Sequence, residues 1–384
     1  MPAETDPKTL AQFVVWGALV LGLLLGAVGQ ATRFCVRGAI ADWVVFRGPG
    51  RLVSWLLAIA VGAVAIQLMV GAGVFDAGRT IYWGERFPWV SYLVGGLLFG
   101  YGMILAGGCP QRCLVKAGSG NLKALATLVV IAIVSLMTLR GAFAGLRANG
   151  LDALGLTLAG GQDLGAILAR TFSLPPSTLR WLLTSALVAG VLAFAWRMRA
   201  QVERSHWLGG VAVGLLLAAA FYLTGRIGFV AEHPETLEPA WLGTQSRRPE
   251  GLSFSAPLGH ALDLLTLWTD KATVATFGVM LALGTLIGAF VTAKLRGDFR
   301  LESFRTPGEL GGHTAGAVLM GFGGITALGC SLGNGVTGAA MLSTGALIAT
   351  VGITAGAWLA LARQLRRGEL SAGAVPPTAG ASAG

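Results

Sequence analysis

An internal repeat in the apolar part of the chain most constrains the fold, because it places two of the four cysteines at equivalent points. When Val94–Cys109 is aligned with Ala315–Cys330, eight of sixteen positions are identical. The identical pairs are Gly95/Gly316, Leu98/Leu319, Gly100/Gly321, Gly102/Gly323, Ile104/Ile325, Ala106/Ala327, Gly108/Gly329 and Cys109/Cys330. The repeat predicts two related halves, each with a cysteine at the end of a glycine-rich helix.

The composition indicates an integral membrane protein. Hydrophobic residues make up 54% and charged residues 12% of the 384 residues, whereas soluble domains carry roughly 25% charged residues. The sequence has long apolar runs and lacks the alternating polar and apolar residues of membrane-barrel strands, so the spans are expected to be helical. From the polar start of the chain and the length of the first apolar run, we expect no cleavable signal peptide. The net charge of +10 is scattered between the apolar runs, which argues against nucleic acid and agrees with lipid or an anionic substrate as partner.

Runs of about 20 apolar residues predict nine membrane-spanning helices. They are Ala11–Gly29, Arg51–Val74, Trp89–Gly107, Leu122–Phe143, Ser177–Trp196, His206–Leu223, Ala272–Leu295, Gly312–Leu328 and Thr344–Leu361. Four glycine-rich segments are too short to span and too apolar for ordinary loops, namely Gln30–Asp42, Gly108–Gly120, Thr224–Ala231 and Gly329–Gly338. We interpret them as re-entrant or broken helices covered by protein. Pro257–Trp268 is a candidate interfacial helix.

The distribution of lysine and arginine predicts the orientation. A cytoplasmic C-terminus places 17 of the 28 basic residues inside, and nine spans then place the N-terminus outside. The expected division is a first repeat at 1–148, a loop and linking span at 149–205, a second repeat at 206–369 and a disordered tail at 370–384. One odd helix between the repeats inverts the second, so the fold class is an all-α polytopic membrane protein with two inverted-topology repeats. A bacterial inner membrane is the expected location.

The four cysteines favour transport over catalysis or metal binding. A structural disulfide is not expected at membrane depth. Apart from Asp42, the cysteine-bearing segments hold no histidine or carboxylate for zinc. The spacing of Cys109 and Cys113 is C-x3-C rather than the C-x-x-C of thioredoxin-like motifs. Simple packing, a copper(I) path through soft thiolates and a membrane thiol–disulfide oxidoreductase stay open as alternatives.

Thiols on the axis of an inverted repeat suit a soft, sulfur-bearing anion. Sulfur is polarizable and an S–H group is a weak donor, so such a lining binds weakly enough to release. We expect the backbone around the cysteines to add a positive field from half-helix N-termini. The expected path residues are Cys35, Cys109, Cys330, Gly107, Gly108, Gly329, Ser331 and Asn334. The expected anion-attracting residues are Arg33, Arg37, Arg112 and Arg226. No enzyme activity, cofactor or metal is expected.

Three stretches, RFCVRGAI, FPWVSYLVGGLLFGYGMILAGGC and AGAVLMGFGGITALGCSLGNG, resemble the YeeE/YedE family of bacterial inner-membrane sulfur-compound transporters, and in particular its thiosulfate-uptake branch. The resemblance implies that Cys35, Cys109 and Cys330 match the family's three pathway cysteines. It also implies an hourglass protein in which thiosulfate passes by transient S–H···S contacts. A small cytosolic TusA-like sulfur carrier is the partner that the resemblance implies.

The chain departs from the family pattern in three places. Cys113 is an extra thiol of unknown role, and a longer external loop follows Thr224-Gly225-Arg226. The run Thr326-Ala327-Leu328 replaces a smaller glycine-rich turn before Cys330, which predicts a differently shaped constriction. These departures leave the substrate open among thiosulfate, sulfite, a sulfide-like species and a selenium compound.

Overall fold

The computed structural model describes residues 6–233 and 237–367, and that part of the chain is mostly helical. The earlier α-helices are α1 (Pro7–Thr32), α2 (Val36–Ala41), α3 (Gly50–Gly71), α4 (Trp89–Leu105), α5 (Pro110–Gly118) and α6 (Leu122–Arg140). The later ones are α7 (Leu164–Phe172), α8 (Pro176–Arg197), α9 (Arg204–Tyr222), α10 (Ser255–Thr266), α11 (Phe277–Leu295), α12 (Pro307–Thr326) and α13 (Thr344–Arg366). The prediction of an all-α membrane protein is confirmed.

Short elements connect these helices. Antiparallel pairs form between β1 (Arg86–Phe87) and β2 (Leu156–Thr157), and between β3 (Phe229–Val230) and β4 (Ala240–Trp241). The 3₁₀ turns are η2 (Ala77–Arg79), η4 (Asp152–Leu154) and η5 (Arg199–Gln201), and the π-helical turns are η1 (Asp42–Phe46), η3 (Leu146–Leu151), η6 (Leu223–Ile227) and η7 (Gly333–Gly338). Turns of the π type are rare in proteins, and those that do occur often lie at functional sites. Here η7 directly follows the segment that contains Cys330.

Eight helices in the described residues are long and apolar enough to cross a membrane. They are α1 continued through η1, α3, α4 continued through α5, α6, α8, α9 continued through η6, α11 and α13. The ninth expected span, Gly312–Leu328, is also helical, as α12, but it is not one of these eight. Glu309 and His313 lie among glycines in its first half. Because α12 packs against α4 and α6, protein covers it where lipid would otherwise require an apolar surface.

Proline and capping side chains set the helix starts. Pro7, Pro110, Pro176 and Pro307 each occupy the first turn of a helix, where the missing N–H is not needed. The starts of α6 and α13 are capped in the same way. Asn121 Oδ1 accepts a hydrogen bond from the amide of Ala124 at 2.8 Å, and Ser343 Oγ accepts one from the amide of Ala346 at 3.4 Å. The two halves therefore share their capping as well as their glycines.

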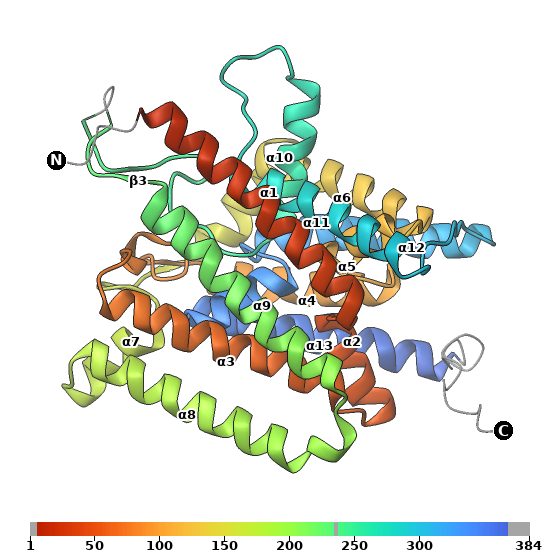
Figure 1. Cartoon of the computed structure of the whole chain (residues 1–384), viewed down its shortest axis with the longest axis horizontal. Helices are drawn as coiled ribbons and strands as arrows, with labels where there is room; N and C mark the ends of the chain where they lie inside the picture. The colour runs from red at the N-terminus through yellow and green to blue at the C-terminus, as the bar shows by residue number, and fades with distance from the viewer. Residues whose placement is uncertain (1–5, 234–236, 368–384) are drawn as a thin grey trace.

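Helices of one half pack mainly on helices of the other. α1 lies along α11 and α3 along α9, while α4 lies along α13 and α6 along α12. If α9, α11, α12 and α13 are the counterparts of α1, α3, α4 and α6, exchanging the halves converts each of these contacts into another. Figure 1 shows α1 and α9 running in opposite directions, as an inverted repeat requires. The pattern supports the division into two inverted repeats, which remains a prediction.

The repeat glycines form the central crossing of α4 and α12. A Cβ added at Gly95 would lie 2.8 Å from the carbonyl oxygen of Gly323, and one added at Gly102 would lie 2.6 Å from that of Gly316. Gly95 matches Gly316 and Gly102 matches Gly323, so the two contacts are equivalent under exchange of the halves. The absence of side chains lets the two backbones touch, as at close helix crossings in membranes.

One of the predicted segments differs from the expectation. Thr224–Ala231 is not a separate broken helix, because α9 runs on through η6 to Ile227 and the chain then enters β3. The Thr224 hydroxyl donates to the carbonyl oxygens of Ala220 and Glu250, both at 2.9 Å, which ties this helical end to the following loop. The loop 149–176 contains α7, and the candidate interfacial helix is α10, packed on α6 and α11. The predicted tail lies outside the described residues.

Candidate functional site

Cys35 lies at the break between α1 and α2. Arg33 ends α1 in the left-handed backbone region, with φ of 55°. The chain then extends, and Cys35 becomes the N-cap of α2, where its Sγ accepts a hydrogen bond from the amide of Gly38 at 3.3 Å. Cysteine thus takes the place of the usual serine or aspartate cap. The thiol is buried but lies beside a non-helical stretch of backbone.

Cys109 and Cys330 are equivalent in structure as well as in sequence. The carbonyl oxygen of Cys109 accepts from the amide of Cys113 at 2.8 Å, and that of Cys330 accepts from the amide of Asn334 at 2.8 Å. Each cysteine therefore opens a short helical segment after a glycine-rich span. Their side chains are 1% and 0% exposed. The Sγ of Cys330 also accepts a hydrogen bond from the amide of Gly333 at 3.4 Å.

The structure brings the three thiols together. The Cys109 side chain is close enough to interact electrostatically with both Cys35 and Cys330, and it faces the hydroxyl of Ser331. Ser331 is fully buried, and its hydroxyl forms no hydrogen bond of standard geometry. The cysteines are free rather than disulfide-bonded. Cys109, which follows α4, thus lies near both the break that carries Cys35 and the turn that carries Cys330.

Asn334 holds the turn in front of Cys330. Its Nδ2 donates to the carbonyl oxygens of Ala327 at 3.0 Å and Gly329 at 2.8 Å, while its buried Oδ1 has no partner. A Cβ at Gly329 would lie 3.1 Å from this amide, so glycine makes room for the contact. The geometry gives Asn334 a positioning role. In the first half, Gly108 similarly faces the Sγ of Cys113. A Cβ added at Gly108 would lie 3.2 Å from this sulfur.

The two halves differ at the turn that precedes each central cysteine. Gly107 and Leu328 are aligned in the repeat, and both have left-handed backbone, with φ of 67° and 55°. Glycine is the residue that usually occupies this position after a helix. A leucine there carries a steric cost of about 1–2 kcal/mol. The carbonyl oxygen of Gly107 accepts a hydrogen bond from the Lys116 ammonium at 2.8 Å.

Two of the four expected arginines line one cavity. Arg33 and Arg112 share a space of about 430 Å³ with Gln30, Arg51, Ser119, Asp298 and Arg300. Four arginines and one aspartate give this cavity a strongly positive field. It lies at the C-terminal end of α1, close to the break that carries Cys35. We refer to it below as the inner cavity; this name and those of the outer cavities follow the orientation predicted from the sequence.

The other predicted residues lie elsewhere. Arg37 interacts electrostatically with Cys113 and Lys116, and its buried Nε has no hydrogen-bond partner. Arg226 is exposed on η6 and does not line the inner cavity or either of the outer cavities described next. Cys113 is 1% exposed on α5 and interacts electrostatically with Cys35. The extra thiol is therefore next to the thiol cluster.

A second basic cavity, which we call the outer vestibule, was not expected from the sequence. It has a volume of about 800 Å³. Its charged lining residues are Arg79, Glu85, Arg86, Arg147, Asp152, Arg247 and Arg248. Trp241 also lines it, and the nearby Gly243 packs on Ala11 and Val14 near the start of α1. Since α1 has 26 residues and is about 39 Å long, the inner cavity and the outer vestibule lie at opposite ends of this helix.

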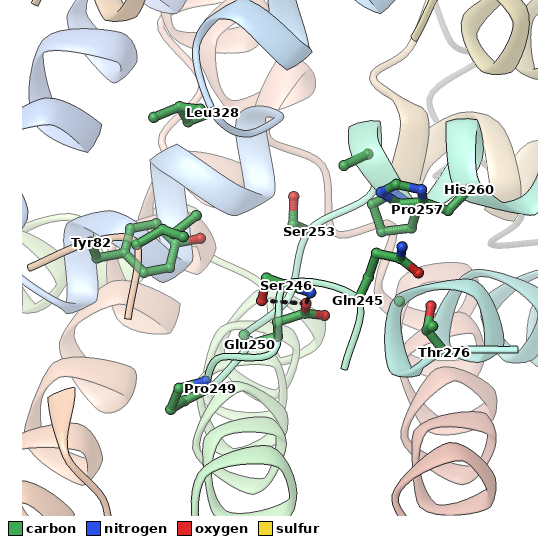
Figure 2. Close-up of a pocket in the computed structure, with 14 residues that line it drawn as sticks. Tyr82, Gln245, Ser246, Pro249, Glu250, Ser253, Pro257, His260, Thr276 and Leu328 are labelled. Atoms are coloured by element: carbon green, nitrogen blue, oxygen red, sulfur yellow. Dashed lines mark hydrogen bonds between the residues drawn. The ribbon is translucent and has the colours of Figure 1, made fainter. Parts of the chain in front are cut away.

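A pocket of about 310 Å³, which we call the outer pocket, adjoins the outer vestibule. Figure 2 shows Tyr82 and Leu328 on one side of it and His260 and Pro257 on the other, with Glu250 between them. The Tyr82 hydroxyl donates to the carbonyl oxygen of Gly333 at 3.1 Å, and the tyrosine interacts electrostatically with Cys330. The pocket therefore reaches the segment that carries the central thiol. Burial raises the pKa of Tyr82, so its hydroxyl stays protonated.

Sequence reasoning missed the outer vestibule because its arginines come from three separate connections between helices. Arg79 and Arg86 precede α4, Arg147 follows α6, and Arg247 and Arg248 precede α10. Loops have no periodicity that predicts which residues meet. The adjacent pair Arg247-Arg248 was the available signal, but the orientation rule counts such residues only as external charge.

The candidate site holds no arrangement suited to a metal. Within residues 6–233 and 237–367, no group of three or more histidine, cysteine, aspartate or glutamate side chains is placed to hold an ion. Cys109 interacts with each of the other two thiols, and these described residues form no such group.

The comparison with known proteins agrees with the resemblance noted in the sequence. The chain is 27% identical to "Thiosulfate transporter TsuA" of Escherichia coli (strain K12) over 382 residues, which cover 94% of this chain and 99% of the relative. It is 24% identical to "Thiosulfate transporter TsuA" of Spirochaeta thermophila over 354 residues, covering 90% and 97% of the two chains. "Probable transporter YedE" of Escherichia coli is 28% identical over 104 residues, which cover 27% of this chain and 24% of the relative.

The family comparison covers most of the chain, from the end of α1 into α13. Residues 31–359 match the model of the family described as "Sulphur transport". That range includes Cys35, Cys109 and Cys330 together with the breaks that carry them. This multi-pass membrane protein therefore belongs to the sulphur transport family.

Proposed function

We propose that this protein carries thiosulfate, or a closely related sulfur anion, across the bacterial inner membrane. The observation that carries the proposal is the cluster of three thiols between two basic cavities at opposite ends of α1. Membership of the sulphur transport family and the names of the two long relatives support the same substrate class. The direct test is growth on thiosulfate as sole sulfur source by a host that lacks its own sulfate and thiosulfate importers. Failure of the membrane-inserted wild type to restore growth would exclude thiosulfate.

The proposed path has four parts in order. An anion is collected by the arginines of the outer vestibule and enters the outer pocket. It then passes Cys330, Cys109 and Cys35, and it leaves through the inner cavity. At the thiols, the terminal sulfur of thiosulfate accepts successive weak S–H···S contacts. Because each contact is weak and the next thiol is close, the anion is passed on without being held.

We further propose the predicted orientation, with the outer vestibule outside and the inner cavity facing the cytosol. In this arrangement the inner cavity opens toward a soluble acceptor, for which a TusA-like sulfur carrier is our candidate. Each basic cavity then attracts the anion to one side of the thiol cluster. The energy barrier to transport therefore lies at the apolar centre between the two cavities. Transport in this scheme needs no covalent change in the protein, so the protein is a transporter and not an enzyme.

Charge reversal in the outer vestibule will reduce uptake at low substrate concentration. In the double variant Arg247→Glu/Arg248→Glu, the positive field that concentrates the dianion is replaced by a negative one. We expect KM for thiosulfate to rise at least about tenfold, with a small effect on the maximal rate and a weaker dependence on ionic strength. The matched control is Arg247→Lys/Arg248→Lys, which keeps both charges. Equal KM values for the two double variants would contradict this role.

Uptake will increase as the external pH falls, because Glu250 lies in the outer pocket. Burial raises the pKa of Glu250, and hydrogen bonds from the amide and hydroxyl of Ser246, at 2.8 and 2.7 Å, offset part of the rise. The groups facing it are Tyr82, which stays protonated, and His260, whose pKa is lowered by burial and then by Arg140. A charged Glu250 repels an entering anion, and its protonated form does not.

The sign of this effect is fixed by the direction of the shift. With a raised pKa, the carboxyl group gains its proton as the pH falls through that value, and the pocket then accepts the anion more readily. Glu250→Gln mimics the protonated form, so its initial uptake rate should lose this pH dependence and match the rate of the wild type at acidic pH. Initial rates between about pH 5 and 8 measure both. An unchanged pH profile in Glu250→Gln would show that another group titrates.

A further inference from the structure

The boundary between the outer vestibule and the outer pocket is apolar. Ile81 and Leu328 line both cavities. On one side of this boundary lie the arginines of the vestibule, and on the other side lie Tyr82, Glu250 and other polar groups of the pocket. An anion that moves from the vestibule toward Cys330 therefore passes two aliphatic side chains.

The backbone around Leu328 is that of a glycine position. After α12, the amide of Leu328 donates to the carbonyl oxygen of Ile325 at 3.1 Å and the amide of Gly329 donates to that of Gly324 at 2.9 Å. These are the two hydrogen bonds of a Schellman motif, whose left-handed residue is commonly glycine. The aligned residue in the other half is Gly107. Leucine occupies this position despite the steric cost, and its side chain lines both outer cavities, whereas Leu342, which has the same backbone conformation, lines neither.

The Leu328 side chain packs against the cluster formed by Tyr92, Ala327 and Ala349, on which Phe87 also packs. It is only partly buried, whereas Ala327 and Gly329 on either side of it are buried. The leucine lines both outer cavities, and Figure 2 shows it above Tyr82 at the edge of the outer pocket.

We propose that Leu328 and Ile81 form an apolar collar that selects the anion before it reaches the thiols. Apolar constrictions act by excluding water. Sulfate carries four oxygens and must lose hydration at each of them to pass. Thiosulfate has a polarizable terminal sulfur that tolerates contact with aliphatic side chains. The collar thus admits the sulfur end first and aims it at Cys330. The selectivity part rests on the proposed function, while the position of the collar does not.

The first experiment measures access to Cys330 without reference to any transported substrate. In a chain with Cys35, Cys109 and Cys113 replaced by alanine, a membrane-impermeant anionic thiosulfonate reagent is added from the vestibule side. Leu328→Gly should raise the labelling rate of Cys330 about tenfold or more, since the side chain that narrows the entrance is gone. The matched control is Leu342→Gly. Leu342 is also a leucine with left-handed backbone conformation, with φ of 55°, but it lines neither outer cavity.

The second experiment measures selectivity with all four cysteines present. Leu328→Gly and Leu328→Ala should both raise the uptake of sulfate relative to thiosulfate by about tenfold, and Leu342→Gly should leave the ratio unchanged. Equal labelling rates with and without Leu328 would overturn the collar. Faster labelling with an unchanged ratio would overturn the selective role. If the wild type fails to transport thiosulfate, the proposed function fails, but the labelling experiment still decides whether the collar exists.

Discussion

Replacing Cys109 or Cys330 with alanine will abolish thiosulfate uptake while the protein still accumulates in the membrane. Both side chains are buried, and alanine fits where cysteine did, because a buried free cysteine behaves as a small apolar residue. The variants lose one sulfur atom each and little packing. What disappears is a polarizable group and weak donor from the set in which Cys109 interacts with Cys35 and Cys330. With one step of the path missing, the anion faces an apolar gap in which its charge is unsolvated.

The control for this prediction is Cys113→Ala on the same helix. Cys113 is as buried as Cys109 and one turn away from it, but it interacts with Cys35, Lys116 and Arg37 at the edge of the cluster. We expect this variant to retain uptake, measured as growth on thiosulfate and as the initial rate of labelled thiosulfate entry. Normal uptake by both Cys109→Ala and Cys330→Ala would mean that the repeat cysteines serve only in packing. A persistent disulfide between them in the working protein would instead favour a thiol–disulfide oxidoreductase.

The helical segments of this fold were predictable from the sequence, but their ends were less so. Each of the nine predicted spans coincides with a helix, because a run of apolar residues long enough to cross a membrane must satisfy its backbone within itself. The starts of α1 and α12 were placed too late. Hydropathy marks only the apolar part, whereas Asp6 and Thr306 cap these helices several residues earlier and a proline follows each cap.

The candidate site divides in the same way. The cysteines stood out because the repeat aligned Cys109 with Cys330, and the inner arginines stood out because Arg33 adjoins a cysteine-bearing break. Arg79 and Arg147 gave no such signal, since residues in separate loops meet only when the helices are packed. Leu328 was visible as a departure from a glycine-rich turn. Its left-handed backbone and its place between two cavities required the structure.

The second large effect is expected at Gly100, where α4 touches α13. A Cβ at this position would overlap the carbonyl oxygen of Ile353, and this oxygen is a backbone atom that no rotamer change can move. Gly100→Ala must therefore push two central helices apart. Overpacking of this kind costs about 1–3 kcal/mol or more, and the displacement also shifts α4, which leads directly to Cys109. We expect most of the extracted protein to aggregate and the remainder to melt at a lower temperature.

Two matched variants separate this close approach from the general effect of adding a methyl group. Gly190→Ala lies within α8 with nothing within 4 Å of the added Cβ, and it should stabilise the protein by roughly 0.5–1 kcal/mol. Gly321→Ala, the repeat counterpart of Gly100, meets the Val134 side chain at 2.8 Å before any backbone atom, so it should be milder than Gly100→Ala. Size-exclusion profiles and melting temperatures in detergent rank the three. A Gly100→Ala protein that is monodisperse and melts like Gly190→Ala would show that the α4–α13 contact is looser than its backbone distance implies.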